Sequence, residues 1–529
     1  KNADDVAEVN ELRRKSSELT EDYKSIKQIA EVNEASANAA KAELYRLRAA
    51  YERPSEVAAR YKEIEMPHIK AEKVEEPVKD NNNDEMSWLE EVGKKCDNYG
   101  LHFNPRILKA FHTALKTAEW SPITILAGAS GTGKSELPRL YSHFGGILFE
   151  PLSVQPNWDS QESMLGFFNS IDNKFAAKPV LNFLAQSQQP GNETFKHRIE
   201  RWEKMAPDHL SLDPKKEEDK KLIEALKQSD YPGLMDSVCM ILLDEMNIAY
   251  PELYFAEFLS KLERRRGMKL EVPHLPVEIG AGMPHYQLPL GRNVLWTGTM
   301  NQDETTKTLS DKVLDRSITI YFPRPTTLHR RKALKPLDHN NRGTLLHRST
   351  WWNWLALVPD PDNPKLKIPG SDLADKDIKP YKNFLEDMND ALGEVGRALG
   401  HRVWQSVEYY MANYPDVRAA QQATDKDALK KALHLAFEDQ LVQKVMPKLR
   451  GIDTPERSVG GKCLVKIRGQ ITNGVGGNSF SLAKDFDLAC QLGYGQFIWQ
   501  SANYLEENAD VGEFASLDDG QEKAGQAEQ

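Results

Sequence analysis

Hydrophobic residues near the N-terminus recur at alternating steps of three and four. The positions, of which all but Ser16 and Asn33 are apolar, are Val9, Leu12, Ser16, Leu19, Tyr23, Ile26, Ala30, Asn33, Ala37, Ala40, Leu44, Leu47 and Tyr51. An average step of 3.5 residues is typical of the seam of a left-handed coiled coil rather than of an ordinary surface helix. We therefore predict a coiled coil over residues 1–64, formed with another chain or as a returning hairpin. A single amphipathic helix packed on its own domain is the alternative.

Short apolar runs farther along the chain predict buried strands. The runs cover residues 123–127, 238–243, 293–300 and 317–322. Helical periodicity between Trp88 and Ala118 leads directly into the first run, and a second helical stretch covers 136–143. Strands of this kind, interspersed with helices, predict an α/β fold with a parallel sheet.

Composition limits the classes of protein that this chain can belong to. The chain has 529 residues, of which 69 are basic and 79 acidic, for a net charge of −10, and 40% are hydrophobic. No apolar run approaches the ~20 residues that a membrane-spanning helix needs, so we expect no membrane contact. The four cysteines are far apart and form no C-x-x-C pair, which favours a reducing, cytoplasmic location. The acidic balance still allows a local basic channel for nucleic acid.

A phosphate-binding loop follows the first apolar run. The segment matches G-x-x-x-x-G-K-[ST] and comprises Gly128, Ala129, Ser130, Gly131, Thr132, Gly133, Lys134 and Ser135. Between a strand and a helix, such a loop wraps its backbone N–H groups around phosphates. We expect Lys134 to reach the β- and γ-phosphates and the hydroxyl of Ser135 to bind Mg²⁺.

Acidic and polar residues follow two other predicted strands. Asp244 and Glu245 directly follow the run at 238–243. Asp244 suits the Mg²⁺ coordination sphere, and Glu245 suits the role of the base that polarises the attacking water. Asn301 ends the run at 293–300 and could hold that water, with a strand-end turn as the alternative. Arg316 precedes the last run and could reach a neighbouring subunit's γ-phosphate, with a surface salt bridge as the alternative.

Together these motifs resemble the AAA+ superfamily, within it the branch of McrB-type NTPases, MoxR proteins and dynein-related modules. The resemblance covers about Trp88 to Asp453. Beyond the nucleotide motifs it includes the segments 154–159, 165–167, 243–247, 298–301, 400–403 and 439–449. It implies that Asn301 is the sensor-1 residue and Arg316 the arginine finger. It also implies that Arg402 is a sensor-2 residue that touches nucleotide within its own subunit, with Arg397 as the alternative.

The resemblance also implies a homo-oligomeric ring, usually a hexamer, with nucleotide between neighbours. McrB relatives that use GTP carry a Met-Asn-x-x-Asp signature, and here Glu304 stands in place of that Asp. This departure favours ATP, with GTP as the alternative. The family's fold implies an AAA+ P-loop core followed by a helical lid domain.

These observations predict the following domain order. We expect a coiled coil at 1–64, a linker at 65–86, a large α/β domain at 87–335, a helical lid with an insert at 336–455, a C-terminal extension at 456–505 and a disordered acidic tail at 506–529. Alternating apolar residues and glycines within 267–292 suggest a β-hairpin that faces a pore or a partner, or a hairpin without such a role. Trp158, Phe167 and Phe168 suggest a second substrate-facing loop, with core packing as the alternative.

The favoured function is an NTP-driven motor that translocates or remodels a bound substrate in bacterial anti-phage defence or restriction. No nuclease motif is apparent, so cleavage would belong to a separate nuclease or effector subunit. Nucleic acid is a possible substrate. Two alternatives stay open: a MoxR-like chaperone that remodels a protein, and a scaffold whose assembly is gated by nucleotide.

Overall fold

The computed structural model describes residues 11, 14–16, 19–21, 23–37, 54–70, 75–79, 84–191, 193–207, 209–210, 212–227, 232–267, 269–280, 282–302, 307, 309–325 and 336–508. The chain forms two compact units. The first comprises residues 1–62, 195–228 and 278–285, and the second comprises the remainder. Each unit is described by itself.

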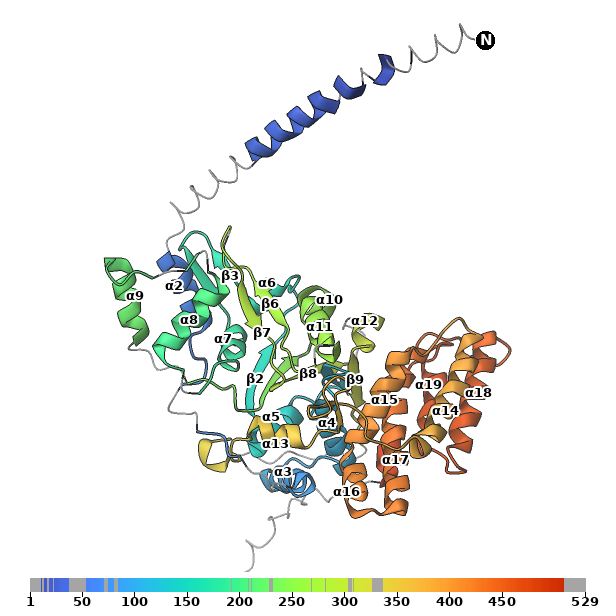
Figure 1. Ribbon diagram of the computed structural model, residues 1–529. Coiled ribbons are helices and arrows are strands. Elements are labelled where there is room, and N and C mark those ends of the chain that lie inside the picture. The colour runs from blue at the N-terminus through green and yellow to red at the C-terminus, as the bar shows by residue number, and fades with distance from the viewer. Residues whose placement is uncertain are drawn as a thin grey trace, which may run out of the picture. The chain divides into compact units, whose positions relative to one another are not determined.

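A five-stranded parallel sheet forms the centre of the second unit (Figure 1). Its order is β2-β5-β8-β1-β9, with β1 at Ile123–Gly128, β2 at Leu148–Ser153, β5 at Cys239–Asp244, β8 at Val294–Asn301 and β9 at Ser317–Tyr321. Every residue of β1 and β9 is buried, as expected of strands that are covered on both faces. The predicted α/β class and four predicted strands are confirmed. The edge strand β2, which mixes buried and exposed residues, was not predicted.

Helices flank this sheet. They are α3 (Glu85–Tyr99), α4 (Pro105–Lys116), α5 (Glu136–Gly145), α6 (Gln161–Leu165), α7 (Pro179–Gln186), α10 (Pro251–Tyr254), α11 (Ala256–Glu263) and α12 (Asp311–Leu314). The helical periodicity at 88–118 belongs to two helices rather than one. The chain turns at Gly100, whose φ of 100° is accessible chiefly to glycine, and Asn104 caps the start of α4.

Two antiparallel hairpins accompany the sheet. One pairs β3 (Gly166–Asn169) with β4 (Lys174–Ala177), and the other pairs β6 (His274–Val277) with β7 (Tyr286–Pro289). The second confirms the hairpin that the sequence predicted within 267–292. Its apolar residues Leu275, Val277 and Ile279 are buried, so they pack inside the protein.

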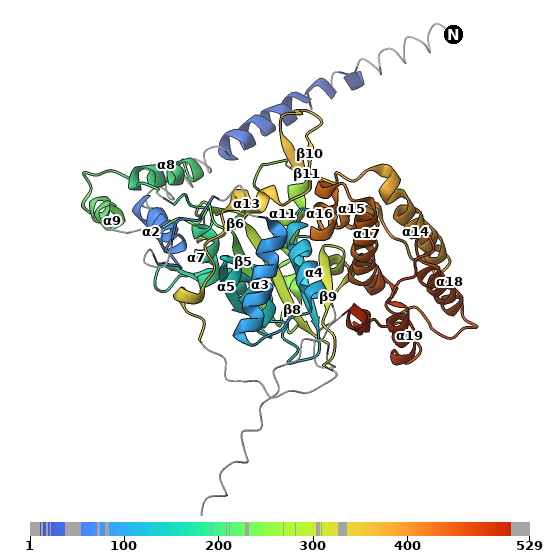
Figure 2. The same cartoon turned by 90° about the horizontal axis from the view of Figure 1, so that it is seen from below.

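The C-terminal part of the second unit is mainly helical (Figures 1 and 2). It comprises η3 (His339–Asn341), α13 (Arg348–Asn353), a small hairpin of β10 (Leu357–Pro359) and β11 (Lys367–Pro369), α14 (Asp375–Gly393), α15 (His401–Asn413), α16 (Pro415–Ala423), α17 (Lys426–Gln440), a π-helical turn η4 (Leu441–Val445), η5 (Met446–Leu449), α18 (Val459–Asn473), α19 (Ala483–Leu492) and η6 (Asn503–Asn508). Buried Arg106 on α4 joins this part to the sheet region, because it binds Glu438 at 2.7 Å and Asp439 at 2.9 Å.

The first unit contains α8 (Phe195–Met205), α9 (Glu217–Lys227) and residues 54–62 of α2 (Pro54–Ile64). Its small core includes Trp202, whose ring lies 5.9 Å from that of Tyr61 in an edge-on arrangement. The side chain of Arg60 donates to the carbonyl of Ile279 at 2.9 Å. The loop between β6 and β7 thereby belongs to the same unit as α2.

The predicted coiled coil is described only in part. Residues 11, 14–16, 19–21 and 23–37 are helical and exposed, including the seam residues Leu19 and Tyr23 at 68% each. The seam positions 9, 12, 40, 44, 47 and 51 lie outside the described residues, as does the part of the expected tail beyond residue 508. The coiled coil and the domain boundaries stay predictions. In the part of the chain that the structure describes, no helix is both long and apolar enough to cross a membrane.

Candidate functional site

The predicted phosphate loop connects the carboxyl end of β1 to the start of α5. Gly131 and Gly133 have φ values of 81° and 92°, which side chains with a Cβ rarely adopt. Both glycines therefore permit the tight curl of the loop. The buried amino group of Lys134 donates to the carbonyl oxygens of Gly128 at 3.0 Å and Ala129 at 2.6 Å. It is thus held at the loop, beside residues 129–132.

Two expected Mg²⁺ ligands meet at this loop. The hydroxyl of Ser135 donates to a carboxylate oxygen of Asp244 at 2.7 Å. Ser135 precedes α5 and Asp244 ends β5, so a loop and a strand that are distant in sequence supply adjacent oxygen atoms. Hydroxyl and carboxylate oxygens are ligands that Mg²⁺ prefers, so this pair fits such an ion.

The two residues expected to handle water also meet. The side-chain amide of Asn301 donates to a carboxylate oxygen of Glu245 at 3.2 Å. Asn301 is the register partner of Gly128 on the adjacent strand, about 4.8 Å away across the parallel ladder. Glu245 is exposed and has φ of 55°, an uncommon conformation for a residue with a side chain. The turn after β5 thus holds this carboxylate at the sheet's carboxyl edge in a strained backbone conformation.

Thr299 is a site residue that sequence reasoning missed. Its buried hydroxyl donates to Asp244 at 2.6 Å and accepts the backbone N–H of Glu245 at 2.8 Å. One hydroxyl therefore orients both acidic residues. The sequence carries a signal for it, since Thr299 is a polar residue inside an apolar strand, but its partners follow only from the pairing of β5 with β8.

Asn247 is a further polar residue at the carboxyl ends of these strands. Its buried amide donates to the carbonyl of Asn301 at 3.0 Å and to that of Lys307 at 3.2 Å. It therefore fixes the backbone at the end of β8. Asp303 and Glu304, on which the choice between ATP and GTP was based, lie outside the described residues.

Arg316 lies at the amino ends of the strands, opposite to the end that carries the phosphate loop. It immediately precedes β9, whose first residue Ser317 pairs with Ile123 at the start of β1. Gly128 is five residues farther along β1, roughly 17 Å at about 3.3 Å per residue. An arginine side chain is shorter than this distance, so Arg316 is remote from its own phosphate loop.

Arg402, at the start of α15, lies beside Arg316. Both guanidinium groups bind the carboxylate of Glu263 at the end of α11, with Arg316 Nε at 2.6 Å. Arg266 is a third partner at 3.1 Å. The expected contact of Arg402 with nucleotide in its own subunit stays a prediction; in this structure its guanidinium binds Glu263. The alternative residue Arg397 instead donates to the carbonyl of Lys448 at 2.6 Å.

The charge of Glu263 is stabilised by these arginines. Burial by itself would raise the pKa of Glu263, but the hydrogen bond and charge of Arg316, together with the charges of Arg402 and Arg266, lower it below its ordinary value. Glu263 is thus an anion at neutral pH and an intramolecular partner for the predicted arginine finger. Arg316 forms a salt bridge in this structure, and its role as an arginine finger stays a prediction.

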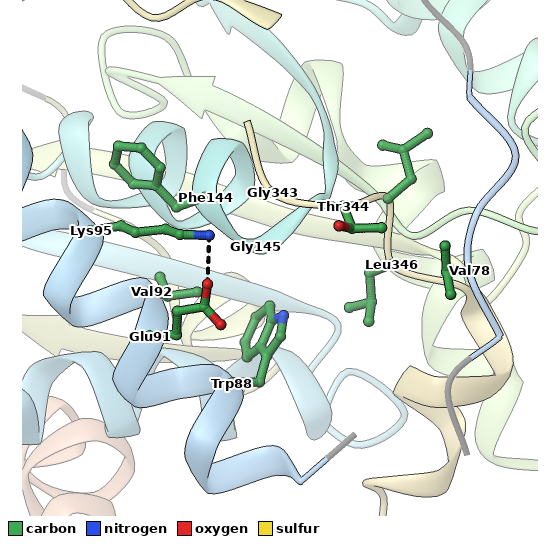
Figure 3. Close-up of a pocket in the computed structure, with 11 residues that line it drawn as sticks. Val78, Trp88, Glu91, Val92, Lys95, Phe144, Gly145, Gly343, Thr344 and Leu346 are labelled. Atoms are coloured by element: carbon green, nitrogen blue, oxygen red, sulfur yellow. Dashed lines mark ion pairs between the residues drawn. The ribbon is translucent and has the colours of Figure 1, made fainter. Parts of the chain in front are cut away.

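A separate pocket of about 240 Å³ lies between α3, the end of α5 and residues 343–346 (Figure 3). Trp88, Val92 and Phe144 contribute apolar walls, and Glu91 and Lys95 form an ion pair at 2.7 Å beside them. None of the predicted site residues lines it. The pocket is therefore distinct from the phosphate loop.

Comparisons with known proteins leave the family open. Residues 363–486 match the model of a domain of unknown function, DUF8727. No curated protein matches the chain. Among solved structures, the crystal structure of a "putative ATPase" from Cytophaga hutchinsonii is similar at 11% identity, covers 66% of this chain and 86% of its own, and has a TM-score of 0.31. Similarity at this level carries no functional argument.

Proposed function

We propose that this chain is a nucleoside triphosphatase of the AAA+ type. The observation that carries the proposal is the meeting of Ser135 and Asp244 at 2.7 Å beside a glycine-rich loop. Backbone N–H groups at such a loop and helix start bind phosphates. Lys134 would exchange its two loop carbonyls for the β- and γ-phosphates.

Ser135 and Asp244 would hold Mg²⁺ between the loop and β5. When bound, the ion would neutralise charge on the phosphate oxygens. Thr299 would keep the Asp244 carboxylate in place through its hydrogen bond at 2.6 Å. This support matters because a carboxylate that rotates away from the loop no longer presents its oxygen to the ion.

Glu245 would accept a proton from the attacking water, and Asn301 would orient that water. The hydrogen bond of 3.2 Å between the two side chains supports this assignment, because a water bound by both would lie beside the γ-phosphate position. The backbone N–H of Glu245 is held by Thr299, so the base is positioned by the neighbouring strand.

Turnover would require a second copy of the chain. Arg316 is separated from its own loop by the length of β1, so its proposed action on a γ-phosphate would take place in a neighbouring subunit. A closed ring, with six copies as in the family that the sequence resembles, would supply such a neighbour at every site. Arg402, at the same edge as Arg316, would then act with it.

The remaining features follow from the resemblance. The helical region would act as the lid, and the N-terminal rod as a coiled coil for recognition or assembly. ATP is favoured over GTP. We propose a motor role in bacterial anti-phage defence, with a separate nuclease as partner and nucleic acid as a possible substrate. The hairpin β3–β4 supports substrate contact, because Phe167 is 53% exposed and Ile171 91% exposed, whereas Trp158 is buried against Tyr254.

A protein-remodelling chaperone and a nucleotide-gated scaffold are the alternative functions. All three share the nucleotide site and differ in what stimulates it. DNA or RNA should accelerate turnover by a nucleic-acid motor, whereas a chaperone should respond only to its protein substrate. A scaffold should assemble when nucleotide binds, and neither nucleic acid nor a protein substrate should accelerate its turnover much.

The test is turnover of ATP and of GTP, with and without DNA or RNA, for the wild-type chain and Glu245→Gln. We expect the variant to bind nucleotide and lose turnover by about 100-fold or more, because general-base removal typically costs 10²–10⁴. Glu257→Gln, an exposed glutamate on α11, is the matched control. If Glu245→Gln keeps wild-type turnover, the assignment of Glu245 as the base is wrong. If the wild type shows no turnover, the proposal that the chain is a nucleoside triphosphatase is wrong.

A further inference from the structure

Lys444 is a buried lysine in the π-helical turn η4, and it has no role in the proposed binding or hydrolysis of nucleotide. Its side chain is 3% exposed. Its amino nitrogen donates to the carbonyl oxygens of Asp315 and Ser317, each at 2.8 Å, and lies 3.2 Å from the hydroxyl of Ser121. All three partners are neutral oxygens, so the contacts are directional hydrogen bonds rather than an ion pair.

The two carbonyls belong to the residues immediately before and after Arg316. An amino group that binds both oxygens fixes the 315–316 peptide group, which directly precedes that arginine, and the 317–318 peptide group, one residue beyond it. Lys448, one turn later in η5, binds the carboxylate of Asp315 as well. The helical region therefore contacts the corner between α12 and β9 at three points, all of them made by the two lysines.

Burial of an amino group is costly, which argues that these contacts have a use. A π-helical turn such as η4 is also uncommon and often occurs at functional sites. Here the wider turn is the element that carries Lys444 to the start of β9, and it packs directly against that strand. The side chain of Arg316, by contrast, makes partly exposed contacts with Glu263 and the carbonyl of Lys312.

We propose that Lys444 is a positioning residue for Arg316. It holds the backbone on both sides of the arginine, so that the guanidinium projects from the amino edge of the sheet toward a neighbouring copy. This inference rests on the proposed function, because it requires Arg316 to act on a neighbour's nucleotide. It links the helical region to turnover without any contact between Lys444 and nucleotide.

The test compares Lys444→Met, which keeps the length of the side chain and removes the donor, with Lys431→Met, an exposed lysine on α17. We expect Lys444→Met to lower kcat by about 100-fold, the size of effect produced by a misplacement of about 1 Å. Binding of a fluorescent ATP analogue to the variant should be unchanged, since the phosphate loop is remote. Lys431→Met should behave as the wild type.

Mixed assemblies separate positioning from damage to the fold. Lys444→Met subunits are combined with Lys134→Ala subunits, which lack the phosphate-binding amine and retain a correctly held Arg316. Turnover should return in the mixture, because the Lys134→Ala subunit supplies the arginine to the intact loop of its neighbour. Lys444→Met combined with Arg316→Ala should have the turnover of Arg316→Ala alone, since Lys444 affects turnover only while the arginine is present.

The outcomes are distinguishable from failure of the proposed function. If Arg316→Ala retains turnover, the arginine finger itself is wrong. If Arg316→Ala abolishes turnover while Lys444→Met keeps wild-type kcat, or if the mixture stays inactive, only the role of Lys444 is overturned. If Lys444→Met fails to bind the analogue, Lys444→Leu, which also lacks the donor, takes its place in the same mixture, and the same two results decide.

Discussion

The Nε atom of Arg316 donates to a carboxylate oxygen of Glu263 at 2.6 Å within one chain. Glu263 also binds Arg402. One carboxylate thus forms ion pairs with both arginines that are proposed to reach a neighbour's phosphate. A phosphate that takes up these arginines must displace or share this carboxylate. Glu263 is thus expected to compete with the nucleotide of the adjacent subunit.

Glu263→Gln should lower the KM for ATP by up to about fivefold, because a partly exposed ion pair contributes about 0.2–1 kcal/mol. Steady-state kinetics measure the change, and Glu257→Gln on the same helix is the control. A fall in kcat by orders of magnitude with unchanged KM would instead mean that Glu263 orients the arginines and does not compete.

Thr299→Val should reduce turnover by about tenfold to 100-fold, the usual cost of losing a residue that orients a metal ligand. Valine keeps the shape of threonine and removes the hydroxyl that joins Asp244 to Glu245. Thr297→Val is the matched control, since Thr297 is buried on the same strand and donates only to the carbonyl of Ile241. Equal losses of turnover in both variants would show a general effect on β8.

Ser135→Ala should weaken the dependence of nucleotide binding on Mg²⁺. The hydroxyl is one of the two protein oxygens expected at the ion, so the variant should need about tenfold more Mg²⁺ for half-maximal turnover. Titration of Mg²⁺ at fixed ATP measures this shift, and Ser479→Ala, an exposed serine outside the site, is the control. An unchanged midpoint would remove Ser135 from the metal site.

The stability of the fold should depend on Lys444 in a defined pH window. Burial lowers the pKa of Lys444 from 10.5 to about 7, with Lys448 acting in the same direction. Between these two values the unfolded chain binds a proton that the folded chain does not. Stability therefore rises with pH across the window and is independent of this group below it.

Lys444→Met should lose this part of the pH dependence. Denaturant midpoints for the wild type, Lys444→Met and Lys431→Met, measured at pH 7, 8 and 9, report the slope of stability against pH. The first variant should have a shallower slope and the second the wild-type slope. Parallel slopes for all three proteins would show that Lys444 does not change protonation on unfolding.

Much of the nucleotide loop could be predicted because its chemistry is local. Strand β1, the glycines at 131 and 133, Lys134 and the start of α5 follow one another in the chain, and each residue type has a direct conformational reason. The terminal residues Asp244 and Asn301 could be predicted as well, because parallel strands place their carboxyl ends at one edge.

The sequence by itself determined which groups this protein carries and on which kind of element each one lies. Tertiary structure decided which of them meet. Thr299 joins Asp244 and Glu245 only through the register of two strands, and Arg402 meets Arg316 only because α15 packs near the end of α11. Local patterns report backbone conformation and burial, whereas such pairings depend on contacts between residues 54 to 139 positions apart, which a local pattern does not encode.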